Sequence, residues 1–104
     1  MTVKEFKEML EMTGFPVAYS HFNSKVTAPF ITFSFEGSNN FQADNIVFHK
    51  VGNLVIELYT TTKNPETEQI LETILNEHGF PFDDSETWIP TEKLFQKIYE
   101  TRFL

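Results

Sequence analysis

The chain of 104 residues contains no cysteine and only four glycines. Without cysteine, disulfide bridges and thiolate metal sites are excluded, which fits a reducing cytoplasm. No window approaches the roughly 18 apolar residues that a membrane-spanning helix needs. Lysines and glutamates alternate over residues 4–8, where a signal peptide would have an apolar run. We therefore expect a protein that crosses no membrane and stays in the compartment where it is made.

Basic residues are also scarce. Eight Lys and Arg stand against fifteen Asp and Glu, which gives a formal net charge of −7. Between Lys63 and Lys93 there are eight acids and no base. Because phosphate binding requires clustered Lys and Arg, this charge distribution argues against a grip on nucleic acid. The simplest interpretation of the acidic segment, residues 66–92, is a solvated helix face and loop, and a surface that repels phosphate is the alternative.

The sequence lacks a recognisable catalytic or ligand-binding pattern. Its three histidines are far apart in the chain, without the spacing that places two imidazoles on one metal. Glu68 and Glu72 lie one helical turn apart, but with no base nearby they are expected to be exposed like charges. The acids of residues 83–86 lack the ligand spacing of a calcium loop. We expect no catalytic residue, no metal ligand and no cofactor, and hence no enzyme.

The centre of the chain is a strand followed by a helix. Residues 54–62 alternate, so that Leu54, Ile56 and Leu58 fall on one face. Asn64 and Pro65 suit the cap and first position of the next helix. An apolar stripe over residues 70–75 can then cover the strand, and Gly79 is a good terminator. The hydrophobic content of 40% and the chain length predict one domain, residues 1–104, around a single core.

The remaining elements follow from local patterns. Thr2 and Glu5 have capping-box spacing at the start of a helix that ends near Thr13. Short and long strands are expected over residues 16–22, 30–36 and 41–50, with a hairpin loop over 37–40 and a turn over 51–53. Residues 80–82 begin an extended segment, 83–86 form a loop tip, 88–89 resume the strand and 90–92 turn the chain. Residues 93–104 fit helix or strand spacing, and their Phe, Ile, Tyr and Thr content favours a strand.

These elements give the order α-β-β-β-β-α-β-β. An α+β fold is therefore predicted, with a mostly antiparallel β-sheet and two helices packed on one face.

Aromatic residues make up 15% of the chain, including twelve Phe. Six of them fall on faces or in loops that the core does not obviously need: Phe22, Phe30, Phe41, Tyr59, Trp88 and Tyr99. Aromatic side chains outside a small core tend to be buried against partners, although a small domain can also pack many Phe inside. The candidate subunit-interface residues are Phe22, Phe41, Tyr59, Trp88 and Tyr99. Unpaired sheet edges would also invite strand addition.

Five segments resemble small proteins of the head–tail region of long-tailed phages and prophages of Gram-positive bacteria. They are Pro29–Phe33, Phe41–Asn45, Ile56–Thr60, Lys63–Glu68 and Trp88–Phe95. The resemblance spans most of the chain from residue 15 onward. Within that group, the order of elements is similar to that of tail terminators, also called tail completion or head–tail joining proteins. The matching positions mark turns and strands, so the resemblance assigns no individual interface residue.

The resemblance implies a non-enzymatic virion protein, made in the bacterial host cytoplasm and located in the neck of the particle. It would form a homo-oligomeric ring, commonly a hexamer, on the head-proximal end of the tail tube. There it would end tube growth and contact the major tail tube protein and the head–tail connector. The acidic segment could border the channel, where repulsion lets DNA slide. Two alternatives stay open: another component of that region, such as a minor capsid or head-closure protein, and a small acidic adaptor for a basic partner protein.

Overall fold

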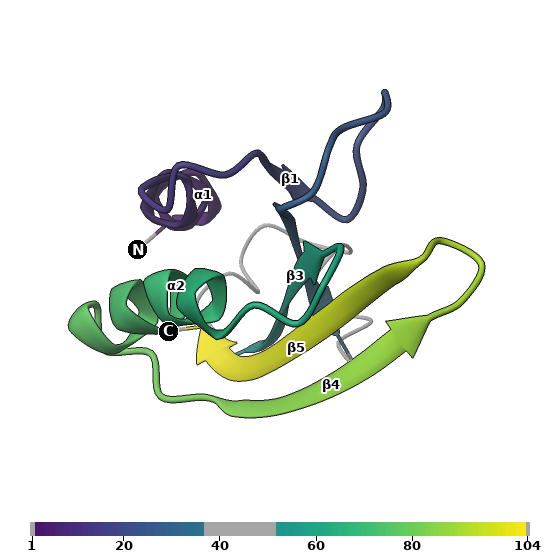
Figure 1. Ribbon diagram of the computed structural model, residues 1–104. Coiled ribbons are helices and arrows are strands. Elements are labelled where there is room, and N and C mark those ends of the chain that lie inside the picture. The colour runs from purple at the N-terminus through teal and green to yellow at the C-terminus, as the bar shows by residue number, and fades with distance from the viewer. Residues whose placement is uncertain (1, 37–51, 104) are drawn as a thin grey trace.

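A computed structural model of the chain describes residues 2–36 and 52–103 (Figure 1). The elements are α1 (Val3–Glu11), β1 (Val17–Tyr19), β2 (Phe30–Glu36), β3 (Gly52–Thr60), α2 (Pro65–Glu77), β4 (Asp83–Ile89) and β5 (Leu94–Phe103). The α+β fold is confirmed, and the final segment is a strand, as its composition favoured. The strand expected over residues 41–50, the hairpin loop over 37–40 and the candidate residue Phe41 lie outside the described residues.

The five strands form one sheet in the order β1-β2-β3-β5-β4. β1 is parallel to β2, and the other three pairings are antiparallel. In the centre, Ile31 pairs with Leu58 and Ile56 pairs with Tyr99. The sheet is therefore mixed but mostly antiparallel, as predicted, and within residues 2–36 and 52–103 its two edges are β1 and β4.

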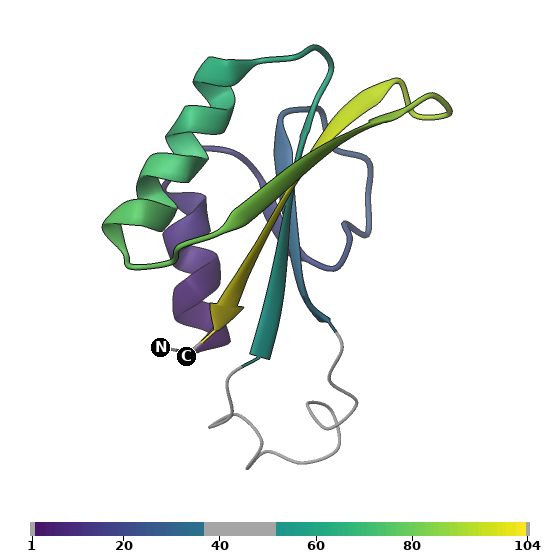
Figure 2. The same cartoon turned by 90° about the horizontal axis from the view of Figure 1, so that it is seen from below.

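Both helices lie on the same side of the sheet (Figure 2). The alternation of β3 turns Leu54, Ile56 and Leu58 towards the helices, and all three are buried. The core also contains Phe6, Met9 and Leu10 of α1, Leu71, Ile74 and Leu75 of α2, and Val17, Ile31, Phe33, Phe80 and Tyr99. We call this side of the sheet the helix face and the opposite side the open face. The predicted cover of the central strand by the apolar stripe of the second helix is confirmed for Leu71, Ile74 and Leu75, whereas Ile70, also expected in the stripe, is 44% exposed.

Local signals fix both ends of α2. The side-chain oxygen of Asn64 accepts a hydrogen bond from the backbone N–H of Thr67 at 3.1 Å, which satisfies one of the free donors of the first turn. Pro65 is the first helical residue. At the other end, Gly79 has φ of +80°, a conformation that glycine adopts without a steric penalty. The Phe80 N–H then bonds to the Leu75 carbonyl at 2.9 Å, and this turns the Phe80 ring back into the core.

Three elements differ from the sequence-based expectation. The turn expected over residues 51–53 is wrong at Gly52 and Asn53, which are the first residues of β3. Asp83–Glu86 do not form a loop tip, because they are the first half of β4 and pair with β5 from Asp83 opposite Glu100 to Ile89 opposite Leu94. Asp, Ser and Glu have low strand propensity, but the long partner β5 supplies a complete ladder of hydrogen bonds. The strand expected over residues 16–22 is also shorter, since β1 ends at Tyr19.

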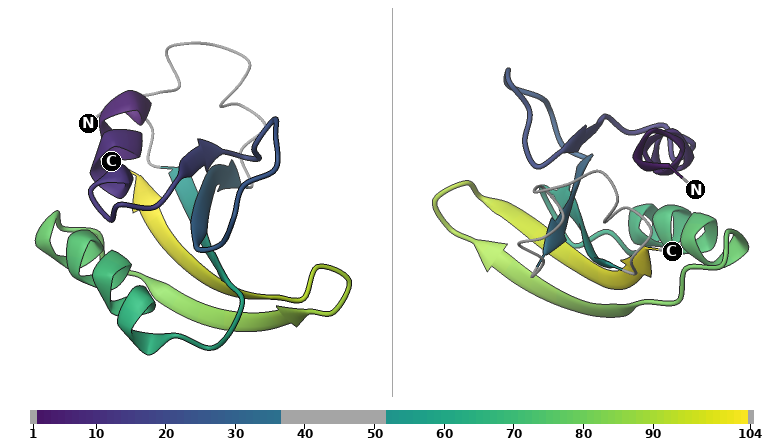
Figure 3. Two further views of the ribbon diagram at one scale, coloured as in Figure 1. Left: turned by 45° about the horizontal axis from the view of Figure 1, so that its top comes forward. Right: turned by 180° about the vertical axis from the view of Figure 1, so that it is seen from behind.

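The β4–β5 hairpin reaches away from both helices. The two views of Figure 3 agree on this, with the turn of the hairpin on the opposite side of the molecule from α1 and α2. The turn falls at residues 90–93, one residue longer than the predicted 90–92, and Lys93 takes a positive φ of 56° there. At the end of the sheet where this turn lies, neither face is covered by a helix.

Candidate interaction surface

A row of stacked aromatic rings lies on the open face. The rings of Phe30 and Tyr59 are nearly parallel, with centroids 4.8 Å apart. Phe22 meets Phe30 edge-to-face at 5.6 Å. Phe30 and Tyr59 are direct partners on β2 and β3, and Phe22 reaches them from the segment between β1 and β2. The candidate residues Phe22 and Tyr59 are thus brought together through Phe30.

A polar network beneath this row holds the Tyr59 ring in place. The Glu57 carboxylate accepts hydrogen bonds from Thr32 at 2.9 Å, from Tyr59 at 3.2 Å and from Gln96 at 3.0 Å. The Tyr59 hydroxyl also accepts a bond from the Gln96 amide at 3.0 Å. Partial burial, and then the negative charge of Glu57, raise the pKa of Tyr59. The hydroxyl therefore stays neutral and acts as a fixed donor.

The aromatic row forms one wall of a groove with a volume of about 610 Å³. The groove lies between residues 20–29 and the β4–β5 turn, which face each other on the right of Figure 1. Its apolar lining comes from Phe22, Val26, Phe30, Tyr59, Ile89 and Leu94. His21 and Lys25 line it on the side of residues 20–29, and Glu92 lines it on the side of the hairpin turn. We call it the open-face groove.

A second aromatic patch consists of Trp88 on β4 and Phe95 on β5, whose ring centroids are 4.8 Å apart. We call it the hairpin patch. Trp88 is 45% exposed despite this contact. In the sheet register, Trp88 and Phe95 align with Thr60, whereas Tyr59 aligns with Gln96 and Thr87. Because side chains alternate along a strand, the hairpin patch lies on the opposite face from the open-face groove.

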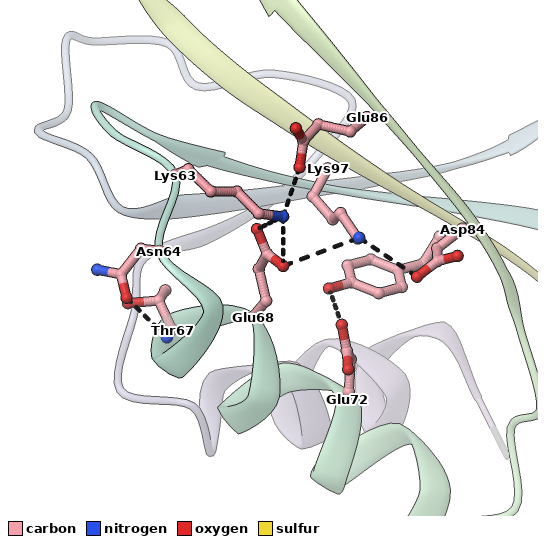
Figure 4. Close-up of polar contacts among 9 residues, drawn as sticks. Lys63, Asn64, Thr67, Glu68, Glu72, Asp84, Glu86 and Lys97 are labelled. Atoms are coloured by element: carbon pink, nitrogen blue, oxygen red, sulfur yellow. Dashed lines mark hydrogen bonds and ion pairs between the residues drawn. The ribbon is translucent and has the colours of Figure 1, made fainter.

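A cluster of charged side chains fixes the hairpin to α2 (Figure 4). Lys63 donates to both oxygens of Glu68, at 2.9 and 3.0 Å, and to Glu86 on β4. Lys97 on β5 lies 3.3 Å from Asp84 and 3.8 Å from Glu68. The bonds to Glu86 and Glu68 raise the pKa of Lys63 to about 12. We call these five residues the α2–hairpin cluster.

Tyr99 lies beside this cluster. Its hydroxyl donates to Glu72 of α2 at 2.7 Å, and its ring meets Phe82 edge-to-face at 5.0 Å. Burial, followed by the bond to Glu72, raises the pKa of Tyr99 well above its ordinary value. Tyr99 is fully buried, so the expectation that it lies outside the core is wrong. It pairs with Ile56 on the helix face, and this places it under α2.

The acidic segment is not a purely solvated surface. Glu68 is only 7% exposed and is paired with two lysines from outside the segment, so the interpretation of Glu68 and Glu72 as exposed like charges is wrong. The two glutamates do lie one helical turn apart, as predicted, but the lysines that pair with Glu68 lie outside α2 and could not be assigned to it from the sequence. The exposed acids of the segment without an ion pair among the described residues are Glu66, Glu77, Asp83 and Glu92.

Sequence reasoning missed Phe95 and Gln96, which complete the two aromatic surfaces. The alternation of residues 94–99 in the sequence does place Phe95 and Gln96 on opposite faces of a strand. Only the register with β3 shows which of the two residues lies on the open face. Within residues 2–36 and 52–103, His, Cys, Asp and Glu nowhere gather in threes that could hold a metal ion. No helix in the same ranges has the length and apolar character to cross a membrane.

Comparison of the chain with protein-family models and with curated proteins gives no match. The role of the open-face groove and the hairpin patch must therefore be derived from their own residues.

Proposed function

We propose that this protein is a structural component of a phage virion. In this proposal it is a tail terminator that caps the head-proximal end of the tail tube as a ring, ends tube growth and joins tail to head. Two lines support it. The five segments between residues 29 and 95 resemble proteins of this class, and the surfaces of the subunit have the features that a ring requires.

The observation that carries the proposal is the pair of aromatic surfaces on opposite faces of one sheet. A ring with head-to-tail contacts uses two different patches on each subunit, whereas a two-fold dimer uses one patch twice. Trp and Tyr are enriched at protein interfaces and among the residues that dominate their energetics. Trp88, which is 45% exposed, lies on one face, and the half-buried Tyr59 lies on the other.

The outer edge of β4 provides a further contact surface. Residues 83–88 are all exposed, and among the residues that the structure describes β4 pairs only with β5. Unpaired strand edges are prone to uncontrolled association, and charged side chains on an edge oppose it. Asp83 places negative charge at this edge, whereas Asp84 and Glu86 are paired with Lys97 and Lys63. In the proposed ring, a strand of a neighbouring protein would complete this edge.

The exposed acids also bear on DNA passage. Glu66 and Glu77 on α2 and Glu92 in the hairpin turn are exposed, and a channel bordered by negative charge does not hold phosphates. We include this as part of the proposal: the acids face or border the channel, and DNA slides past them.

A small acidic adaptor is the second candidate, favoured by the net charge of −7. Such a protein would be a monomer in solution with high affinity for one cationic protein. The two candidates therefore differ in the mass of the purified chain, which light scattering coupled to size-exclusion chromatography measures directly.

Electron microscopy of particles made without this gene tests the proposal. Lysates of the deletion strain should contain overlong or headless tails beside filled capsids, and expression of the wild-type chain from a plasmid should restore joined virions. Capsids that lack DNA, beside tails of normal length, would instead favour a minor capsid or head-closure role. Normal joined virions in the deletion lysate would refute a role in tail termination.

A further inference from the structure

The outer edge of β4 lacks most of the features that protect strand edges from further pairing. Such edges are usually blunted by a short strand, a proline, a bulge or charged side chains. β4 has no proline, and it pairs with β5 one-to-one along its whole length, without a bulge. Its acid Glu86 is engaged by Lys63 (Figure 4). Asp84 is engaged by Lys97 in the same cluster. Within the part of the chain that the structure describes, Asp83 is the one acid of β4 without an ion pair.

The other edge of the sheet is protected by its length. β1 has only three residues, Val17–Tyr19, and a strand this short offers few hydrogen bonds to a partner. The chain therefore has one blunted edge and one long, regular edge. This contrast indicates that β4 is an edge that another strand completes.

Near the hairpin turn, β4 offers an apolar contact to such a strand. Trp88 packs on Phe95 on the helix face and is 45% exposed. A residue placed directly opposite Trp88 on an added strand would cover part of the exposed ring. Aromatic rings pair favourably with aliphatic and β-branched neighbours across strands, so this end of the edge selects an apolar residue.

The other end of β4 offers negative charge on the open face. Asp83 lies directly opposite Glu100 on β5, and both are exposed. Like charges directly opposite each other are unfavourable. The two acids line a hollow of about 280 Å³ together with Asn53 and Arg102, so that two acids there stand against one base. A basic side chain opposite Asp83 would balance this charge, and this end of the edge therefore selects Lys or Arg.

We infer that an extended segment of a different protein completes the edge of β4, and that this segment carries an apolar residue and, five positions later, a Lys or Arg. The spacing follows from Trp88 and Asp83, which are five positions apart, and from antiparallel pairing, the more stable of the two orientations. A second copy of this chain does not fit. Among the described residues its strands with a free edge are β1 and β4, and neither contains a base. The inference rests on the proposed function and specifies the chemistry of the neighbouring strand.

Titration of the full chain with a synthetic peptide tests this edge. The probe is a peptide of about eight residues with blocked ends, made of threonine and valine except for one leucine and a lysine five positions after it. We expect it to shift the backbone amide signals of residues 83–89 in ¹H–¹⁵N spectra and to slow their hydrogen exchange. Two control peptides carry N-methyl groups on the odd or on the even residues, so one of them loses its donors towards β4. That peptide should bind at least about 10-fold more weakly.

Three comparisons check the two selective ends. Trp88→Ala should weaken binding by about 10-fold or more. A peptide with glutamate in place of lysine should bind the wild-type chain about 3- to 10-fold more weakly, and Asp83→Asn should reduce that preference. Ile70→Ala changes an exposed residue of α2 and should leave binding unchanged. Thermal unfolding followed by circular dichroism verifies that each variant is folded.

The outcomes separate this inference from the proposed function. No binding, equal binding of all the N-methylated and unmodified peptides, or shifts that avoid residues 83–89 would overturn the inference. Exchange at residues 83–89 that slows when the chain is concentrated without peptide would also overturn it, because a second copy would then complete the edge. The deletion-strain particles decide on tail termination independently. A termination defect without peptide binding keeps the proposed function and refutes the strand site, whereas peptide binding with normal joined virions keeps the strand site and refutes the tail role.

Discussion

Replacing Tyr99 by Phe should destabilise the protein measurably, although the ring stays in place. The substitution removes only the hydroxyl that donates to Glu72 at 2.7 Å and keeps the contact with Phe82. A hydrogen bond to a charged group contributes about 1.5–3 kcal/mol. Glu72 is partly exposed and can recover water, so the lower half of that range applies. We expect a loss of about 1.5 kcal/mol in the free energy of unfolding, or roughly 6–12 °C in Tm.

Urea unfolding followed by far-UV circular dichroism measures this loss. The matched control is Tyr19→Phe, which removes the same group from an exposed ring. The Tyr19 hydroxyl accepts only a long hydrogen bond, 3.5 Å from the Phe35 N–H, so its loss should change the free energy of unfolding by less than about 0.5 kcal/mol. A double-mutant cycle with Glu72→Ala isolates the pair, and its coupling energy should be about 1 kcal/mol or more. If Tyr99→Phe is no more destabilising than Tyr19→Phe, or the coupling energy is near zero, the bond does not hold the hairpin on α2.

Three further outcomes are expected. Stability should fall above about pH 10, because the folded-state pKa values of Tyr99, Tyr59 and Lys63 are raised and the unfolded chain then gives up protons that the native state retains. The slope should be shallower in Tyr99→Phe, and urea titrations between pH 9 and pH 11 that give equal slopes would contradict this. Leu71→Ala should cost about 2–5 kcal/mol in urea unfolding, since Leu71 is fully buried, while the same change at the adjacent exposed Ile70 should cost about 0.5 kcal/mol or less. Asn64→Ala should cost about 0.5–2 kcal/mol by removing the cap of α2, and an unchanged urea midpoint would show that the cap adds no stability.

The contacts that hold the β4–β5 hairpin on α2 matter both for stability and for the proposed function. The α2–hairpin cluster and the Tyr99–Glu72 bond join β4 and β5 to α2, and the hairpin they hold carries Trp88. Weakening these contacts should change the orientation of the hairpin relative to α2, and with it the position of Trp88, while the packing of Trp88 on Phe95 stays intact. Variants of the cluster are therefore expected to impair assembly even when the subunit remains folded.

The sequence alone predicted the elements whose signals are local. The strand around residues 54–60 and the helix from Pro65 follow from alternation, an N-cap and a terminating glycine, which all act within a few residues of one another. The same is true of the capping box between Thr2 and Glu5, where both reciprocal bonds are present. The α+β fold class follows from these elements in order.

Only the tertiary structure decided which residues meet across the chain. Lys63 pairs with Glu86, and Glu72 with Tyr99, over separations of 23 and 27 residues, so neither contact leaves a periodic trace in the sequence. The acidic residues 83–86 became a strand because β5 offered a ladder that outweighed their low propensity. Tyr99 went into the core because its register with Ile56 places it under α2. Local propensity and periodicity fix where an element begins and which side chains share a face, but the partner of that face is chosen by pairing and packing over the whole domain.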